Sequence, residues 1–194
     1  MINLKSKQKI DPRIGKVLIP TKKLNHGIKK AAKWLNIEYK NKQPVIIGIL
    51  KGCIPFIGTI LPMLTFDFQI DFMSASSFKG GLERQKKLDI SLDIKTDIKG
   101  KDVIILEDII DTASTLNMII ELLKTRKPKS IKIVTLLDKL ETRKIDLHAD
   151  YACFQIPNEF IVGFGLDYKE IMRNFNYIGC LKKEFLESEN KKGK

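Results

Sequence analysis

Three carboxylates and three hydroxyl side chains follow one another within a short segment of this chain. Directly after the apolar run 103–106 come Glu107, Asp108 and Asp111, and then Thr112, Ser114 and Thr115. Hydroxyls beside free backbone N–H groups bind phosphate, whereas carboxylates hold sugar hydroxyls or a metal ion. Three acids beside a phosphate would repel it unless the ligand also carried hydroxyls or a metal. The combination therefore indicates a sugar phosphate.

The elements around this segment are expected to point its backbone N–H groups at such a ligand. The run 103–106 is typical of a strand buried on both faces of a parallel sheet. Leu116, Ile119, Ile120 and Leu123 then recur at helical spacing. A strand, a short polar turn and a helix start leave free N–H groups and the positive end of the helix dipole facing the turn. The segment is thus a candidate phosphate cradle.

Strands and helices alternate along the rest of the chain. Strands are expected over 45–50, 66–73, 131–137, 151–156 and 160–164, and helices over about 21–35 and 54–64. This alternation predicts an α/β fold with a parallel sheet covered by helices and a ligand site beyond the carboxyl ends of the strands. Lys51 and Lys139 also follow strand ends, so one pocket could collect them with the acids.

Two stretches show no such pattern. Residues 74–92 are polar without a clear period, and a loop of that length in a compact domain is commonly functional, so we expect a lid here. Residues 184–194 are rich in charged side chains, and we expect them to be a frayed tail.

The acidic segment resembles the phosphoribosyl-pyrophosphate (PRPP) signature of type I phosphoribosyltransferases. Its Glu-Asp-Ile-Ile-Asp-Thr form is similar to that of the hypoxanthine-guanine members of the family. Further segments agree with that family in the same order along the chain: 48–52, 71–77, 136–139, 156–160 and 162–168, with Arg173. The resemblance covers about residues 45–179. It implies a type I phosphoribosyltransferase fold, with a central parallel sheet flanked by helices.

The resemblance also implies a domain organisation. Residues 1–194 would form a single phosphoribosyltransferase domain. A small hood would be built from the N-terminal segment and from residues after about 150.

The activity implied by the resemblance is the Mg²⁺-dependent transfer of a phosphoribosyl group from PRPP to hypoxanthine or guanine in purine salvage. Glu107 and Asp108 would hold the ribose hydroxyls, and Asp111 would be the catalytic base at the purine imidazole ring. The alternative for Asp111 is an ordinary N-cap carboxylate of a helix, and one side chain could serve in part as both. The 5′-phosphate would be bound by Thr112, Ala113, Ser114 and Thr115.

The same resemblance assigns the pyrophosphate and the metal. Pyrophosphate would contact Lys51, Gly52, Ser77, Phe78 and Arg173. The resemblance also implies a strained peptide at Leu50–Lys51, and the sequence leaves open whether that peptide is cis. Mg²⁺ would be held by Glu107, Asp108 and Asp167. Mg²⁺ suits such a site because it binds few protein carboxylates and keeps phosphate oxygens and water as ligands.

The purine would contact Lys139, Phe160, Ile161 and Asp167. Phe160 would stack on the base, and Lys139 would donate to its exocyclic oxygen. An ammonium group offers only donors, so the amino group of adenine would meet it donor to donor. The resemblance therefore implies an enzyme for 6-oxopurines.

Two positions depart from the family pattern. Ala113 stands where Gly is usual, and a positive φ there would cost about 1–2 kcal/mol. Phe78 stands where Tyr is more common, so a role that needs the hydroxyl is lost.

Net charge leaves an alternative function open. The chain has 194 residues and a formal net charge of +12, with lysines spread along its length. This charge fits a lysine-rich solvated surface, steering of an anionic substrate, or nucleic-acid binding. No aromatic residues interleave with the lysines, so nucleic acid is unlikely as a partner. The alternative is a regulator of the same fold that binds nucleic acid and senses PRPP or nucleotides.

Other bulk features favour a cytoplasmic enzyme. No apolar run is long enough to span a bilayer, and the start of the chain lacks a secretory pattern. Cys53, Cys153 and Cys180 are widely spaced and are expected to be reduced packing residues. Partners are expected to be the small-molecule substrates and, by the resemblance, further copies of the chain in a homodimer or homotetramer.

Overall fold

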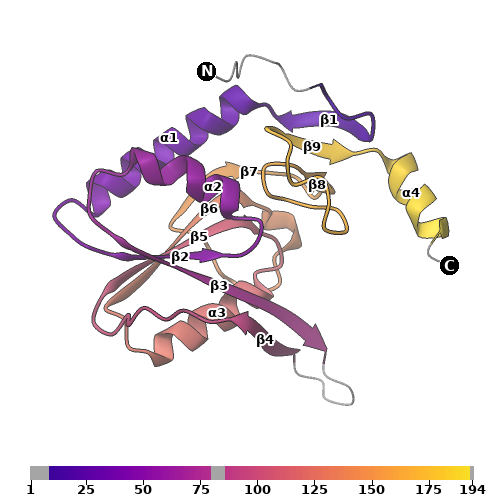
Figure 1. Cartoon of the computed structure of the whole chain (residues 1–194). Coiled ribbons are helices and arrows are strands. Elements are labelled where there is room, and N and C mark those ends of the chain that lie inside the picture. The colour runs from indigo at the N-terminus through magenta and orange to yellow at the C-terminus, as the bar shows by residue number, and fades with distance from the viewer. Residues whose placement is uncertain (1–8, 80–85, 193–194) are drawn as a thin grey trace. The chain divides into compact units, whose positions relative to one another are not determined.

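The computed structural model describes residues 9–79 and 86–192, which fall into two compact units (Figure 1). The larger unit is Asn25–Asn158. The smaller unit combines the described residues of Met1–Leu24 with those of Glu159–Lys194. Helix α1 (Thr21–Glu38) starts in the smaller unit and continues into the larger one.

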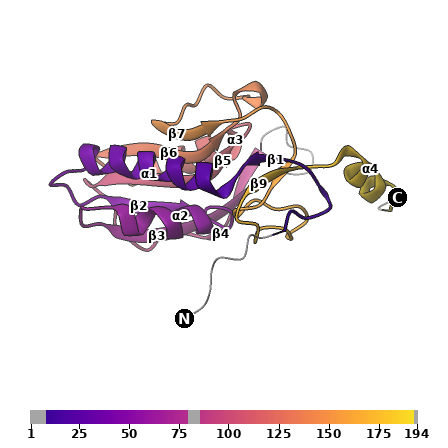
Figure 2. The same ribbon diagram turned by 90° about the horizontal axis from the view of Figure 1, so that it is seen from above.

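The larger unit is built on a six-stranded sheet in the order β4-β3-β2-β5-β6-β7. Its strands are β2 (Val45–Ile49), β3 (Gln69–Lys79), β4 (Lys86–Leu92), β5 (Asp102–Ile110), β6 (Ser130–Asp138) and β7 (Tyr151–Gln155). Neighbouring strands from β3 to β7 are parallel, and Figure 2 shows them in this order beneath α1 and α2. The prediction of a type I phosphoribosyltransferase fold, with a central parallel sheet, is confirmed.

Helices cover both faces of this sheet. Helices α1 and α2 (Ile54–Ile60) lie on one face, and α3 (Ser114–Thr125) lies on the other (Figure 1). Short 3₁₀ helices follow α2 and β6, at Leu61–Met63 (η1) and Leu140–Thr142 (η2).

The strands are apolar on both faces because each face packs against helices. Successive strand side chains point to opposite faces. Val45 and Ile47 of β2 therefore join Ile105 of β5 in the core beneath α3. On the opposite face, a Cβ at Gly48 would lie 2.3 Å from Cδ1 of Ile57, so the missing side chain lets α2 pack closely on β2.

The register of the parallel strands brings their carboxyl ends to one edge. Gly48 of β2 is paired with Leu106 of β5, and Ile110 of β5 is paired with Asp138 of β6. The residues that follow each pairing, including Lys51 and Lys139, therefore emerge on the same side of the sheet.

The lid expected over residues 74–92 is partly wrong, because most of this stretch is strand. β3 continues to Lys79, and β4 returns antiparallel to it. Ala75 and Leu88 pack against the core, and the Oγ atoms of Ser74 and Ser91 lie 2.9 Å apart. These strands are held mainly by backbone pairing. Many of their side chains are polar, so the alternation of apolar and polar residues that marks a strand is weak in this part of the sequence. Residues 80–85 lie outside the described part of the chain.

The smaller unit contains an antiparallel sheet in the order β1-β9-β8. Its elements are β1 (Ile14–Ile19), β8 (Ile161–Val162), β9 (Ile178–Leu181) and the helix α4 (Lys183–Lys192). The prediction of a frayed tail over residues 184–194 is wrong for most of that segment, because residues up to 192 are helical. Phe185 and Leu186 of α4 pack against a cluster that includes Tyr168 and Tyr177, which gives this charged helix an apolar anchor.

A pair of glycine substitutions tests the packing of the larger unit. A Cβ at Gly27 of α1 would lie 2.3 Å from Cζ of Phe154 on β7, whereas a Cβ at Gly58 of α2 would meet nothing within 4 Å. We expect Gly27→Ala to lower the free energy of unfolding by about 1–3 kcal/mol through overpacking. Gly58→Ala is expected to raise it by about 0.5–1 kcal/mol, because Ala favours helix over Gly. Urea unfolding curves measure both, and equal stability of the two variants would contradict this packing.

Candidate active site

A cavity of about 220 Å³ lies at the carboxyl end of β5, within the larger unit. It is lined by Ile49, Leu50, Ala75, Glu107, Ile109, Ile110, Asp111, Thr112, Ala113, Ser114, Thr115, Leu116 and Ile119. All four residues assigned to the 5′-phosphate line it. Thr112 and Ala113 lie in the turn between β5 and α3, and Ser114 and Thr115 begin α3, so the first backbone N–H groups of α3 adjoin the cavity. A strand, a turn and a helix start thus meet as the residue pattern predicted.

Ala113 adopts the left-handed conformation that the sequence left open. Its φ is 63° and its ψ is −1°, and it is the N-cap residue of α3. Its carbonyl oxygen accepts a 2.9 Å hydrogen bond from the backbone N–H of Asn117, and its side chain is buried. A Cβ in this conformation costs about 1–2 kcal/mol, which Gly would not incur.

Glu107 and Asp108 bring two carboxylates together where β5 approaches its turn. Burial raises the pKa of Glu107 well above its usual value, and the neighbouring Asp108 carboxylate raises this pKa further. Asp108 Oδ1 accepts a 2.8 Å hydrogen bond from the backbone N–H of Ile109. Two adjacent acids, one of them poorly solvated, form a site whose repulsion a bound cation would relieve. The pair therefore fits Mg²⁺, which needs only one or two protein carboxylates.

The loop after β2 closes against this pair of acids. A Cβ built at Gly52 would lie 1.5 Å from Oδ2 of Asp108, so only Gly permits this approach. The peptide Leu50–Lys51, whose form the sequence left open, is cis. Lys51 is exposed, and the next two residues are buried. Burial and the two nearby acids raise the pKa of Cys53 to about 12.

Lys139 lies next to Asp111. Its Nζ is 3.6 Å from Oδ2 of Asp111. The Lys139 side chain is only 10% exposed, whereas that of Asp111 is 48% exposed. A mostly buried ammonium therefore adjoins an accessible carboxylate, which places a hydrogen-bond donor and a proton acceptor side by side.

The segment after β6 is tied to the turn after β5. The backbone N–H of Lys139 donates to the carbonyl of Ile110 at 3.0 Å, and that of Lys144 donates to the carbonyl of Thr112 at 3.1 Å. These bonds fix the backbone that carries Lys139 relative to the backbone that carries Asp111.

Arg143 and Asp138 are residues whose role the sequence analysis missed. They form an ion pair in which both side chains are nearly buried, and Arg143 also donates to the carbonyl of Leu147. The carbonyl of Asp138 accepts a 3.0 Å bond from the N–H of Ile156. The pair therefore braces the segment that carries Lys139. The sequence offered one indication of this ion pair, namely an acid and an arginine on either side of Lys139.

The remaining assigned residues of known placement lie in the smaller unit. Asp167 Oδ1 is 2.9 Å from Nη2 of Arg173, whose Nη1 donates to the carbonyl of Gly165 at 2.8 Å. The Phe160 ring is 49% exposed and packs edge-on against Tyr168, with 5.5 Å between the ring centroids. Ile161 is buried at the start of β8.

The two residues assigned to the hairpin are described only by their backbone. Ser77 of β3 is paired with Leu88, and Phe78 is paired with Lys87. Their side chains lie outside the described part of the structure, so their contacts with pyrophosphate stay a prediction.

Comparisons with known proteins show the family to which the chain belongs. A family model described as the phosphoribosyl transferase domain matches residues 20–169, and the chain belongs to the phosphoribosyltransferase family. Its relatives are hypoxanthine-guanine phosphoribosyltransferases. The protein of that name from Streptococcus pneumoniae is 46% identical over 171 residues, which are 88% of this chain and 95% of the relative. The protein of that name from Mycoplasma genitalium is 39% identical over 166 residues, or 86% of this chain and 95% of the relative.

A solved structure supports the same assignment. The crystal structure of a hypoxanthine phosphoribosyltransferase from Staphylococcus aureus matches with a TM-score of 0.85 and 42% identity, covering 89% of this chain and 94% of the other. The family recognised from the motifs is thus confirmed.

The buried ion pair beneath Lys139 can be tested by removing one partner. Arg143→Met would leave the Asp138 carboxylate buried and unpaired, so we expect the free energy of unfolding to fall by about 3–5 kcal/mol. Replacing both residues, as Arg143→Met with Asp138→Leu, is expected to recover much of that loss. Urea unfolding at neutral pH measures both changes.

Arg126→Met is the matched control. Arg126 pairs with Asp93 at 2.6 Å on the surface, and losing an exposed pair costs at most about 1 kcal/mol. If Arg143→Met were no more destabilising than this control, the buried pair would not brace the segment.

Proposed function

We propose that this chain transfers the phosphoribosyl group of PRPP to hypoxanthine or guanine, forming inosine or guanosine monophosphate and pyrophosphate for purine salvage. The observation that carries the proposal is the 3.6 Å separation of Lys139 and Asp111 beside the cavity at the start of α3. The names of the relatives add independent support.

PRPP is proposed to bind with its 5′-phosphate at residues 111–115, where the turn after β5 leads into α3. Backbone N–H groups and the hydroxyls of Thr112, Ser114 and Thr115 would hold the phosphate oxygens. Glu107 and Asp108 would accept hydrogen bonds from the ribose hydroxyls. Lys51 and the N–H of Gly52 would lie against the pyrophosphate, with Ser77, Phe78 and Arg173 as its further contacts.

Bond cleavage separates charge at the sugar. The bond between the anomeric carbon and the pyrophosphate oxygen breaks, and the electron pair leaves with pyrophosphate. A ring nitrogen of the purine then bonds to that carbon, and Asp111 accepts the proton which the imidazole ring loses. The acids near the sugar would stabilise the positive charge that develops there, while Lys51 and Arg173 would neutralise the leaving group.

Mg²⁺ is proposed as the cofactor, held by Glu107 and Asp108, with Asp167 as a further carboxylate near the pyrophosphate. When bound, it would supply positive charge to the pyrophosphate oxygens. Within residues 9–79 and 86–192, no cluster of three or more His, Cys, Asp or Glu side chains could hold a metal by itself. Phosphate oxygens are thus proposed to complete its coordination.

Base selection is assigned to Lys139, Phe160, Ile161 and Asp167. Lys139 would donate to the exocyclic oxygen of the base, and Phe160 would stack on its ring. Backbone carbonyls near Ile161 and Asp167 would accept from the amino group of guanine. Lys139 offers no hydrogen-bond acceptor to the amino group of adenine. With adenine bound, the Lys139 ammonium would stay unpaired, and the resulting loss of binding free energy would exclude that base.

The regulator alternative is favoured only by the charge of +12. The relatives carry the names of enzymes. A donor and a proton acceptor side by side, as in Lys139 and Asp111, are needed for the transfer reaction and not for sensing a nucleotide. Among the described residues, no helix is both long enough and apolar enough to cross a bilayer. The homo-oligomeric state and the cytoplasmic location stay predictions.

Steady-state assays with hypoxanthine, guanine, xanthine and adenine test the roles of Asp111 and Lys139. We expect Asp111→Asn to lower kcat by about 100-fold or more, because a general base is lost. Lys139→Ala is expected to raise the KM for 6-oxopurines by about 10- to 100-fold, because a charged donor is lost. Lys99→Ala, at an exposed lysine with no assigned role, serves as the control. Adenine turnover that is measurable and survives Lys139→Ala would contradict the assignment.

Ala113→Gly tests the cost of the left-handed turn. Gly adopts a positive φ freely, so the phosphate-binding conformation should be more populated before PRPP binds. We expect the KM for PRPP to fall several-fold, with little change in kcat. Initial rates at varied PRPP measure this, and an unchanged KM would show that Ala113 does not weaken binding.

A further inference from the structure

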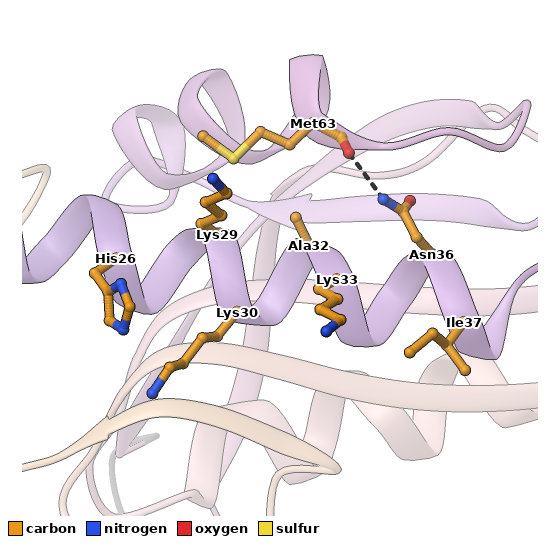
Figure 3. Close-up of a pocket in the computed structure, with 8 residues that line it drawn as sticks. All are labelled: His26, Lys29, Lys30, Ala32, Lys33, Asn36, Ile37 and Met63. Carbon is orange, nitrogen blue, oxygen red and sulfur yellow. Dashed lines mark hydrogen bonds between the residues drawn. The ribbon is translucent and has the colours of Figure 1, made fainter.

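A groove on the surface of the larger unit lies apart from the residues assigned to the reaction. It has a volume of about 780 Å³ and runs along α1 beside η1. Its lining, shown in Figure 3, consists of His26, Lys29, Lys30, Ala32, Lys33, Asn36, Ile37 and Met63. We refer to these residues as the α1 groove. Its volume is in the range of sites that bind ligands.

The wall of the α1 groove is fixed by Asn36. The Asn36 side-chain amide donates to the carbonyl of Met63 at 2.9 Å, and its oxygen accepts from the backbone N–H of Thr65 at 2.9 Å. One side chain therefore ties the segment after α2 to α1 on both sides of Leu64. The groove is accordingly a built feature of the fold.

The rim of the α1 groove is cationic. Lys29, Lys30 and Lys33 form none of the ion pairs found among the described residues. Figure 3 shows Lys29 pointing toward Met63 and Lys30 extending on the other side of α1. The single acid of α1, Glu38, is already paired with Lys132 at 3.0 Å and Lys42 at 3.7 Å. The positive charge of the rim is thus available to a partner.

The α1 groove also offers apolar surface between these charges. The apolar residue Ile37 is 70% exposed, whereas Leu35, two residues earlier in α1, is fully buried. Met63, which is half-buried, lines the groove on the other side of α1, whereas Ala32 at its floor is buried (Figure 3). A partner that buried Ile37 would remove apolar surface from water, which favours binding.

We propose that the α1 groove docks an acidic amphipathic segment of a partner protein, with an apolar stripe on Ile37 and Met63 and flanking carboxylates on Lys29, Lys30 and Lys33. This interaction goes beyond the transfer reaction and does not depend on it. Helices that place one apolar face in a groove bind proteins in this way. Lys29, Lys30 and Lys33, which the proposed reaction does not use, thereby acquire a role.

Other occupants fit the α1 groove less well. A second copy related by two-fold symmetry would set lysine against lysine. Single-stranded nucleic acid binds through successive stacked aromatic rings, and the residues that line the groove include no Phe, Tyr or Trp and a single His26. A membrane needs a broad apolar helix face, but Ile28, Ala31 and Leu35 are buried in the protein.

Fluorescence anisotropy with defined peptides tests the proposal on the full-length protein. The probe is a labelled helical peptide of about 15 residues, with leucines at one helical face and glutamates on both flanks. A peptide of the same composition in scrambled order is its control. We expect the striped peptide to bind at least about tenfold more tightly than the scrambled one, and its affinity to fall with added salt.

Variants locate the binding. Lys29→Glu with Lys30→Glu and Lys33→Glu, and separately Ile37→Ser, should each weaken binding of the striped peptide about tenfold or more. The charge-matched control carries Lys95→Glu, Lys99→Glu and Lys127→Glu and should bind as the wild type does. Carbodiimide cross-links from the peptide should map to Lys29, Lys30 and Lys33. Circular dichroism and hypoxanthine transfer should be unchanged in all variants.

Three outcomes would overturn the proposal. One is equal affinity of the striped and scrambled peptides. Another is equal weakening by the groove variant and its charge-matched control, which would indicate general attraction to the basic surface. The third is tighter binding of poly(U) RNA or of vesicles rich in phosphatidylserine that is lost in the groove variant only, which would assign the α1 groove to those ligands.

Discussion

The parallel register of β5 with β2 and β6 is the constraint on which the candidate active site depends. It brings the ends of three strands together, and it lets the loop after β2 approach Asp108 until no side chain fits at Gly52. The segment after β6 is bound in turn to Ile110 and Thr112 by backbone hydrogen bonds. Each side chain of the larger unit that is assigned to the reaction therefore emerges from backbone held by a neighbouring strand or loop.

This arrangement concentrates charge that the protein alone leaves partly uncompensated. Glu107 is poorly solvated beside Asp108, so its pKa is raised, and the first turn of α3 contains no acid that would compete with a phosphate. Lys139 compensates Asp111, and Arg143 compensates Asp138 one residue before Lys139. Binding sites often combine such unfavourable groupings with a rigid frame, because the ligand supplies the missing charge.

The sequence predicted the elements whose pattern is strong and missed those held by other means. The β5 strand, the turn after it and α3 were predicted because a double-sided apolar run and helical spacing mark them clearly. The β3–β4 hairpin was missed because backbone pairing rather than alternating apolar residues holds it. The α4 helix was missed because its apolar contacts come from two residues, Phe185 and Leu186, within a segment of mostly charged side chains. Arg143 was missed because its burial depends on a tertiary contact. The φ of Ala113 could not be predicted, because the sequence allows either sign at this position, and it is positive in the structure.

If the base binds as proposed, the closeness of Lys139 and Asp111 has a consequence for which nitrogen of the base is joined to the sugar. A cation and an anion 3.6 Å apart form a fixed dipole that a planar base can match in one orientation, with its carbonyl toward the ammonium and its imidazole N–H toward the carboxylate. A base lying the other way would set its own donors against Lys139. The dipole would therefore decide which ring nitrogen is left facing the sugar, and so which of the possible glycosidic isomers is made.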